Sequence, residues 1–451
     1  METLFERCAR KFPLATAARI LFERALAPET LNELFEQTAQ EQYTRVTLFS
    51  DLVNLMGSVV HRVHRSLHAA FQDSALQACV SQSTIYDKIN NLEPQVSAEF
   101  VRQTTERIIE VTDHLQASLP PLVPGYETRI LDGNAIAATD HRLEVLRDTR
   151  SGPLPGKSLA FYDHERDMIR EIIPCEDGHA QERSLSDEIL KRVKPKMLTI
   201  ADRNFCTAKI LVGIDERQGS FIIRQHRSLP FYEETPLAPV SSENARLKEG
   251  TVIVTFEGKS IRLRRICLSL PNPTRDGDLE IFVLTNLPPE DASAELVMEC
   301  YRKRWKLETT FATLTTTIRC ELPSLGYPRA ALFTFSTAAV AANLLAGIRL
   351  AIRAGHGIEK EECVSTYHLL EGLRSSAGSL EVIENADHDW GKYAKMDINE
   401  FTKIFLEIVD RFDLNRYRKA KTRPRAPRRI RGTPNDPPHV STHRLLQAAK
   451  K

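Results

Sequence analysis

The chain has 451 residues, of which 27% are charged and 42% hydrophobic, and its formal net charge at pH 7 is +1. This length allows two or three domains with a large core, and the composition is ordinary for a globular protein. Its eight cysteines are scattered without a C-x-x-C pair, which argues against a zinc ribbon or a disulfide framework and fits a reducing compartment.

Residues 1–120 are predicted to form a helical region. They contain long amphipathic stretches, such as Val46–Leu55 and Ala98–Leu115, and few strand-like alternations. The first residues include Glu2 and Glu6, where a signal peptide has a basic start. We therefore expect a cytoplasmic protein.

Within this region, the segment Leu76–Leu92 resembles a helix-turn-helix reader of the DNA major groove. Val80 and Ile85 can pack inward, and Ser81 can cap a second helix. That helix would present four polar side chains outward: Gln82, Ser83, Thr84 and Lys88. The pattern is degenerate, so two ordinary packed helices remain an equal alternative.

Three histidines in the same region, His61, His64 and His68, have a spacing that could surround a metal ion. Arg62 and Arg65 lie between them, and no acid or cysteine is near in the sequence. A helix face that is solvated or laid on DNA is therefore favoured over a zinc site.

After the proline-rich stretch 118–128, strand-like and helical segments alternate. The strand-like runs are Arg129–Ala137, Ser158–Tyr162, Met168–Pro174, Met197–Ala201 and Gly219–Arg224, and the helical ones are Gln181–Val193 and Cys206–Glu216. Three consecutive strands followed by alternating helix and strand predict a mixed sheet with helices on its faces. The fold class is thus α/β, in a multidomain α+β chain.

Residues 228–288 are again β-rich and look like an insertion into this sheet domain. Helices are expected at Ala292–Leu314, at 330–352 and from about residue 360 onward. The uncharged stretch Ala330–Ile348 is long enough to cross a membrane. It is rich in Ala, Thr, Ser and Asn and has no interfacial Trp or Tyr belt, so we expect a buried core helix and no membrane partner.

The C-terminal part, residues 401–451, is predicted to be helical and to end in a basic tail. Nine basic residues lie in a proline-broken run without an acid: Arg416, Arg418, Lys419, Lys421, Arg423, Arg425, Arg428, Arg429 and Arg431. Such a run is either a solvated terminus or a clamp for a phosphate backbone.

Carboxylates stand at the ends of two of the predicted strands. Asp132 follows Ile130 and Leu131, and Asp202 follows the run Leu198–Ala201. A buried strand that stops on a carboxylate holds it rigidly at the rim of the sheet. Either acid alone could simply cap a turn or a helix.

A third acid, Glu308, follows Tyr301 and Arg304 at i, i+3, i+7 spacing, so all three share one face of a helix. Glu308 alone could form a routine ion pair with Arg304. In combination, the three acids suit a phosphoryl-transfer site, because hard divalent cations prefer carboxylate oxygens.

At these residues the chain resembles the DDE transposases of bacterial insertion sequences, most of all the IS-four group with its Y-x2-R-x3-E-x6-K signature. The resemblance implies an RNase H-like catalytic domain over residues 121–400, with the β-rich insertion at about 228–288, after an N-terminal DNA-binding region. It implies cut-and-paste transposition in the bacterial cytoplasm, at the nucleoid. Asp132, Asp202 and Glu308 would be the catalytic residues and the ligands of two Mg²⁺ (or Mn²⁺) ions.

The partners implied are double-stranded DNA, namely terminal inverted repeats and target DNA, and a second copy of the chain in a dimeric synaptic complex. Tyr301 and Arg304 would contact DNA, and Arg203 and Arg224 are further DNA-contact candidates. The basic position seven residues after Glu308 is Thr315 here, which cannot supply charge to a 5′-phosphate. Arg319, one turn further on, could substitute.

Two alternatives remain open. The first is a metal-dependent DNA nuclease that cuts but does not join. The second is an inactive, transposase-derived DNA-binding protein, which Thr315 makes conceivable and the intact acids argue against.

Overall fold

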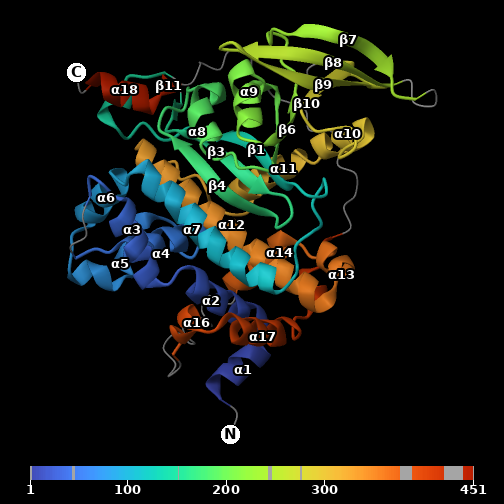
Figure 1. The fold of residues 1–451 in the computed structure, drawn as a ribbon. Helices are drawn as coiled ribbons and strands as arrows, with labels where there is room; N and C mark the ends of the chain where they lie inside the picture. Colours follow the sequence, from blue (N-terminus) through green and yellow to red (C-terminus); the bar gives the residue numbers. More distant parts are fainter. Residues whose placement is uncertain are drawn as a thin grey trace.

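A computed structural model describes residues 3–42, 46–150, 152–241, 246–274, 277–375, 389–420 and 440–449. The N-terminal region is helical, as predicted. Its helices are α1 (Leu4–Lys11), α2 (Pro13–Ala25), α3 (Pro28–Thr38), α4 (Phe49–Val60), α5 (Leu67–Gln72), α6 (Gln82–Asn90) and α7 (Pro94–His114). They form the lower part of the molecule in Figure 1, with α7 running beside the sheet.

Of the expected helix-turn-helix, the structure contains the second helix, α6, but not the first. Ser81 caps α6, and its hydroxyl accepts a hydrogen bond from the amide of Thr84. The segment before it is a 3₁₀ turn, Ala75–Ala78, and not a full helix. Its four residues allow little more than one tight turn, so a first reader helix is not formed here.

His61, His64 and His68 do not share one helix as expected, because α4 ends at Val60, one residue before His61. His64 pairs through Nε2 with Asp73 at 2.9 Å, outside any metal cluster. Burial, aided by Arg374, lowers the pKa of His61 to about 4. Arg62, in the turn that follows α4, has a positive φ of 62°.

The sheet has nine strands in the order β4-β3-β1-β5-β6-β10-β9-β8-β7. Those of the first half are β1 (Glu127–Ala135), β3 (Lys157–Asp163), β4 (Met168–Cys175), β5 (Met197–Ala201) and β6 (Ser220–Arg224). β1 and β3 are antiparallel, as are β3 and β4, whereas β1, β5 and β6 run parallel to one another. The predicted mixed sheet is confirmed.

The β-rich segment does not form a separate body. Its strands are β7 (Tyr232–Pro239), β8 (Leu247–Phe256), β9 (Lys259–Ser269) and β10 (Glu280–Thr285). Because β10 pairs antiparallel with β6, these strands extend the same sheet, at the upper right of Figure 1. The segment thereby widens the sheet by four strands beyond β6.

Helices cover both faces of the sheet. On one face, α8 (Ser186–Leu190) and α9 (Ala208–Glu216) pack against the strands, and on the other lie α7, α10 (Ala294–Arg302), α11 (Trp305–Thr316) and α12 (Pro328–His356). The buried side chains form two apolar clusters, one on each face. Alternate residues of a strand point to opposite faces, so each central strand supplies both clusters.

The apolar helix α12 lies in the interior, as predicted. Among the described residues it is the one helix long and apolar enough to cross a membrane, and 89% of its most apolar window is buried within the protein. Asn343, at its centre, accepts a hydrogen bond from the amide of Ile169 and donates to Thr105 of α7. These polar contacts tie the buried helix to the sheet.

The C-terminal part comprises α13 (Ile358–Glu362), α14 (Thr366–Ser375), α16 (Lys392–Lys395), α17 (Ile398–Val409), β11 (Val440–Ser441) and α18 (Thr442–Ala449). Residues 421–439, which hold most of the predicted basic run, lie outside the described residues. After them, β11 pairs in parallel with β2 (Pro153–Leu154), and Arg444 contacts Asp177 at 2.6 Å. The expected tail therefore ends in a strand and helix packed beside the sheet.

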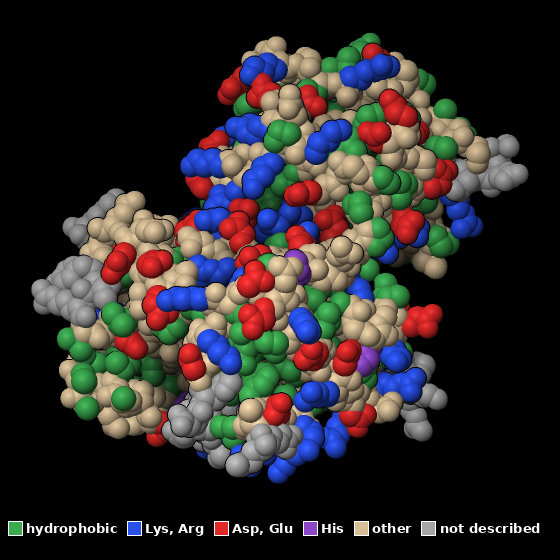
Figure 2. Space-filling model, turned by 60° about the horizontal axis from the view of Figure 1, so that its bottom comes forward, with side chains coloured by type: hydrophobic (Ala, Val, Ile, Leu, Met, Phe, Trp, Pro, Cys, Tyr) green, Lys and Arg blue, Asp and Glu red, His purple; other side chains and the backbone are tan. Residues whose placement is uncertain are grey.

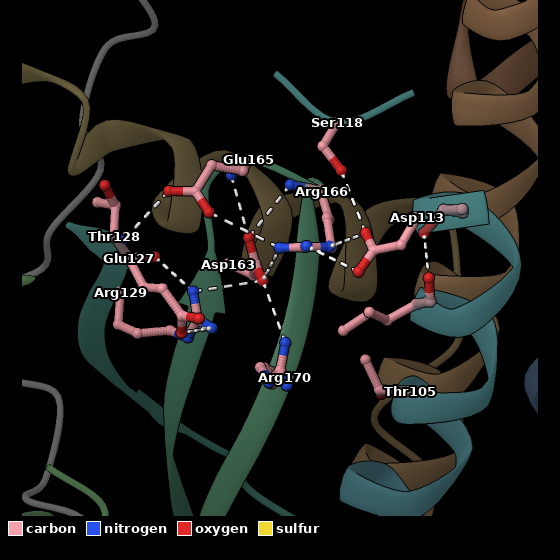
Figure 3. Close-up of polar contacts among 12 residues, drawn as sticks. Thr105, Asp113, Ser118, Glu127, Thr128, Arg129, Asp163, Glu165, Arg166 and Arg170 are labelled. Carbon is pink, nitrogen blue, oxygen red and sulfur yellow. Dashed lines mark hydrogen bonds and ion pairs between the residues drawn. The ribbon is translucent and has the colours of Figure 1, made fainter. Parts of the chain in front are cut away.

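A buried ion-pair network joins α7 to the sheet (Figure 3). Asp163, whose side chain is fully buried at the end of β3, lies within 3.3 Å of Arg129, 3.2 Å of Arg166 and 3.6 Å of Arg170. Arg166 also donates two hydrogen bonds to Asp113 of α7, at 2.8 and 3.0 Å. A buried carboxylate is tolerated only when it is paired, so these arginines hold α7 in place.

Next to this network, burial and the nearby Lys306 and Lys303 lower the pKa of His164 to about 4. The folded protein thus keeps His164 neutral, while the unfolded chain protonates it below about pH 6.5. We predict that His164 costs stability as the pH falls from about 6.5 towards 4, by about 2–3 kcal/mol in full.

The measurement is urea unfolding of wild type and His164→Gln at neutral pH and near pH 4.5. The variant should lose less stability than the wild type on acidification. His114→Gln, at an exposed position, is the matched control. Equal acid sensitivity of wild type and His164→Gln would contradict the prediction.

Candidate active site

Asp132 and Asp202 are neighbours on one face of the sheet. Ile130 and Ile200 belong to the apolar cluster on the α10–α12 face, whereas Leu131 and Ala201 belong to the cluster on the opposite face. By strand alternation, the next residue in each strand returns to the α10–α12 face.

The register places these two acids side by side as well. Leu131 pairs with Ala201 in the parallel β1–β5 ladder, which ends at that pair. Asp132 and Asp202 are the next residues after this pair, so they lie side by side just beyond the last paired residues of β1 and β5. Two apolar runs on adjacent parallel strands thus bring two carboxylates together without any local signal linking them.

The predicted single helix over Ala292–Leu314 is wrong in one respect, since it is broken between α10 and α11. The amide of Arg304 donates to the carbonyl of Tyr301, and that of Leu307 to Arg304, each three residues back. This tightening carries no Gly or Pro signal. Arg304 keeps a right-handed helical backbone (φ −50°, ψ −34°).

The Arg304 guanidinium lies between two of the three acids. One nitrogen donates to Asp132 at 2.8 Å, and the other pairs with Glu308 at 2.6 Å. The Tyr301 hydroxyl donates to Asp202 at 3.4 Å. The side chains of Arg304 and Asp132 are 12% and 17% exposed, so these charges interact with little screening by water.

The site has more negative than positive charge. Burial raises the pKa of Asp132 to about 6 although Arg304 opposes this, and Glu182 and Asp202 add to the rise. Burial and the charge of Asp202 raise the pKa of the Tyr301 phenol to about 12. An additional cation would relieve this repulsion among the carboxylates.

Three carboxylates are a suitable donor set for hard divalent cations such as Mg²⁺. In the described part of the chain, however, no three His, Cys, Asp or Glu side chains stand close enough to hold a metal ion. The Arg304 guanidinium contacts two of the three carboxylates, those of Asp132 and Glu308. The donor chemistry fits, and Asp132, Asp202 and Glu308 would hold the metal once Arg304 gives way.

Glu182 is a fourth acid at this site, and sequence analysis did not identify it. It lies in the 3₁₀ turn Glu182–Leu185, where Asn204 donates to its carboxylate at 3.1 Å. A Cβ atom added to Gly133 would stand 2.1 Å from Glu182 Oε1. A side chain at position 133 would displace the end of the Glu182 side chain, so glycine lets this carboxylate lie close to β1, and the Asp-Gly dipeptide was the available signal.

Arg203 and Arg224 converge on a different acid, Asp278. Arg224 contacts it at 2.6 Å, Arg203 at 3.7 Å and the exposed Arg227 at 3.4 Å. Arg224 is close enough to Tyr301 to oppose the rise of the phenol's pKa. The predicted DNA-contact arginines thus form one cluster beside Asp202, and their role in DNA contact stays a prediction.

Arg319 does not continue the face of Glu308. Helix α11 ends at Thr316, and the Arg319 guanidinium donates to the carbonyl of Arg65 in the N-terminal region at 2.8 Å. The expectation that Arg319 lies one helical turn beyond Thr315 is therefore wrong, because the chain leaves the helix before reaching it. Thr315 itself is exposed on α11.

Surface charge is mixed on the face shown in Figure 2, where basic and acidic side chains are interspersed. This agrees with the net charge of +1.

Residues 125–344 match the model of a protein family described as "Transposase DDE domain". This span includes Asp132, Asp202 and Glu308, and the match supports a DDE transposase. A comparison with curated proteins finds no match. Among solved structures, the chain is similar to a "Cryo-EM structure of piggyBac transposase synaptic complex with hairpin DNA (SNHP)", at 12% identity and a TM-score of 0.41, over 88% of this chain and 86% of that chain.

We predict that Arg304→Gln tightens Mg²⁺ binding to the DNA-free protein, by about tenfold. The variant removes the cation that occupies Asp132 and Glu308, which corresponds to about 1.4 kcal/mol. Isothermal titration calorimetry measures this directly. Arg302→Gln, an exposed neighbour, is the control, and Arg304→Gln/Asp132→Ala should lose the gain. Unchanged affinity in Arg304→Gln would show that the guanidinium does not compete with the metal.

Proposed function

We propose, on the premise of a transposase DDE domain at residues 125–344, that the protein catalyses cut-and-paste transposition of a bacterial insertion sequence of the IS-four type. The single observation that supports this most is the convergence of Asp132 and Glu308 on Arg304, with Asp202 beside them. A site rich in carboxylates beside an arginine and a tyrosine suits a phosphodiester and its metal ions.

Asp132, Asp202 and Glu308 are the proposed catalytic residues. Two Mg²⁺ (or Mn²⁺) ions held by them would activate the attacking water or 3′-hydroxyl and stabilise the leaving oxygen. One site can then perform both strand cleavage and strand transfer, since only the nucleophile changes.

Arg304 has two alternative sets of partners in this proposal. Without DNA it pairs with Asp132 and Glu308. With DNA it releases both carboxylates and donates to a phosphate near the cut, for which its planar fork of donors is suited. Tyr301 is protonated at neutral pH, as an ordinary tyrosine is, and its pKa is raised further to about 12, so its hydroxyl can donate to a phosphate or to Asp202.

The proposed partners are double-stranded DNA, as terminal inverted repeats and target, and a second copy of the chain in the synaptic complex. The proposed location is the bacterial cytoplasm, at the nucleoid. The RNase H-like classification of the catalytic domain belongs to this proposal too. The order β4-β3-β1-β5-β6, with three antiparallel and then parallel strands, is compatible with it.

A joining assay tests the function. A DNA fragment that carries the element's ends is incubated with a target plasmid and Mg²⁺, and joined products are counted. Asp132→Ala, Asp202→Ala and Glu308→Ala should each lower joining by at least about a thousandfold while end binding persists. Asp187→Ala, an exposed acid of α8, should leave joining unchanged.

Cleaved ends without joined products would favour the nuclease, and end binding without cleavage by the wild type would favour the inactive relative. Joining that survives all three alanine substitutions would refute the site.

We further predict that Thr315→Lys strengthens the complex with DNA ends. Thr315 is exposed on α11, two turns beyond Glu308 and on the same face, so a lysine there can reach a 5′-phosphate. The slope of log affinity against log salt should steepen by about 0.9 for one new duplex phosphate contact.

Thr316→Lys is the matched control, because it adds the same charge on a different face of α11. Gel-shift titrations at several salt concentrations compare the two variants. Equal gains for both would mean that charge alone, and not the position facing the site, is responsible.

A further inference from the structure

A cleft opens beside Asp132 and Asp202, on the α8–α9 face of the sheet, opposite to the face that carries the two carboxylates. Its volume is about 520 Å³, and it is bounded by the turn at Glu182, the 3₁₀ turn Arg203–Phe205 and the loop 226–230. Cys206 and Leu229, which line it, belong to the apolar cluster on the α8–α9 face. Asp132 and the cleft are therefore separated only by the open end of the β1–β5 ladder.

The cleft has a basic lining. Three cations and two imidazoles face it against one acid, Glu182: Lys157, Arg183, Arg203, His179 and His226. Lys157 donates to the carbonyl of Ala180 at 2.6 Å, and Arg183 to the side-chain oxygen of Gln181 at 2.6 Å. Both of these partners are neutral, so they orient the two cations without cancelling their charge.

The remaining lining is uncharged. It comprises the polar residues Gln181, Asn204, Thr207 and Ser228 and the small or apolar residues Ala180, Cys206, Ala208, Leu229 and Pro230. No aromatic ring of Phe, Tyr or Trp is among the lining residues. A polyanion with a modest apolar surface fits such a cleft, whereas an apolar ligand or a cation does not. DNA strands have this chemistry, since phosphates alternate with sugars and bases.

We propose that this cleft binds single-stranded DNA that continues from the phosphate being cut. The inference rests on the proposed function and extends it, because the strand must leave the carboxylates on the side away from α11. The cleft, of about 520 Å³, has room for part of a single strand. A duplex is too wide for it, since its major groove alone measures about 12 Å across. Without stacking rings, the cleft holds the backbone with little preference for base sequence.

Passage from one face to the other is possible at this point because Gly133 and Glu182 line the open end of the ladder. Asp132 projects to the α11 face and Gly133 to the face of the cleft. A strand that bends across the ends of β1 and β5 thus meets the carboxylates first and the cations of the cleft next. Arg203 directly follows Asp202 in the chain and lines the cleft. It also pairs with Asp278.

The test is binding of a labelled oligo-dT of about 15 nucleotides by the full chain in EDTA, followed by fluorescence anisotropy at several salt concentrations. Arg183→Ala should weaken this binding by about fivefold and flatten the salt slope by about 0.7, the value for one contact to a single strand. A blunt duplex of the same length should bind equally to wild type and variant.

Lys191→Ala is the matched control, since it removes one exposed positive charge from the adjacent helix α8, outside the cleft. Arg183→Lys, which keeps the charge, should retain most of the affinity. Unchanged melting temperatures show that each variant is folded.

Equal losses in Arg183→Ala and Lys191→Ala, or equal losses for single strand and duplex, would overturn the proposal. Binding in EDTA requires no catalysis, so the result is independent of the joining assay. If joining is weak but single-strand binding is intact and depends on Arg183, the proposed function is contradicted and the proposal for the cleft is retained.

Discussion

The Arg304 guanidinium is the interaction on which the geometry of the candidate site depends. It joins Asp132 of β1 to Glu308 of α11, residues from opposite ends of the sheet domain, at 2.8 and 2.6 Å. Removing one partner from a largely buried ion pair leaves a charge uncompensated, at a cost of about 3–5 kcal/mol. Among the described side chains there is no preformed metal cluster. Arg304 thus holds Asp132 and Glu308 on one guanidinium.

Around this contact, the fold supplies a rigid frame. The parallel pair β1–β5 ends on two aspartates at one level, and the apolar clusters on its two faces fix which way each side chain points. The buried network at Asp163 anchors α7 to β3, and the polar contacts of Asn343 anchor α12. Catalytic groups on such elements lose little entropy when they bind a substrate. Where the β1–β5 ladder ends, Asp132 and Asp202 lie on one face of the sheet and the basic cleft lies on the other.

Features set by local pattern were predictable from sequence. Of the two apolar runs expected to end strands, the run before Asp202 does so, since β5 ends at Ala201, whereas β1 continues past Asp132 to Ala135 because it stays paired with β3. The Ala-rich run of α12 indicated a core helix and Ser81 indicated a cap, and the structure bears out both. Features set by distant partners were not predictable. Arg304 pairs with Asp132, the fourth acid Glu182 lies against Gly133, and Arg319 turns to the carbonyl of Arg65. None of these pairs is close in the sequence, so propensity and periodicity carry no information about them.

The central claim is that Arg304 exchanges its carboxylate partners for a DNA phosphate when metal ions enter. The most direct measurement is a crystal structure of the full chain with a DNA end and Mn²⁺, with anomalous diffraction recorded at the manganese edge. We expect manganese peaks among Asp132, Asp202 and Glu308, with the Arg304 guanidinium moved onto a phosphate. Manganese bound elsewhere, or Arg304 still paired with Asp132 beside bound DNA, would contradict it.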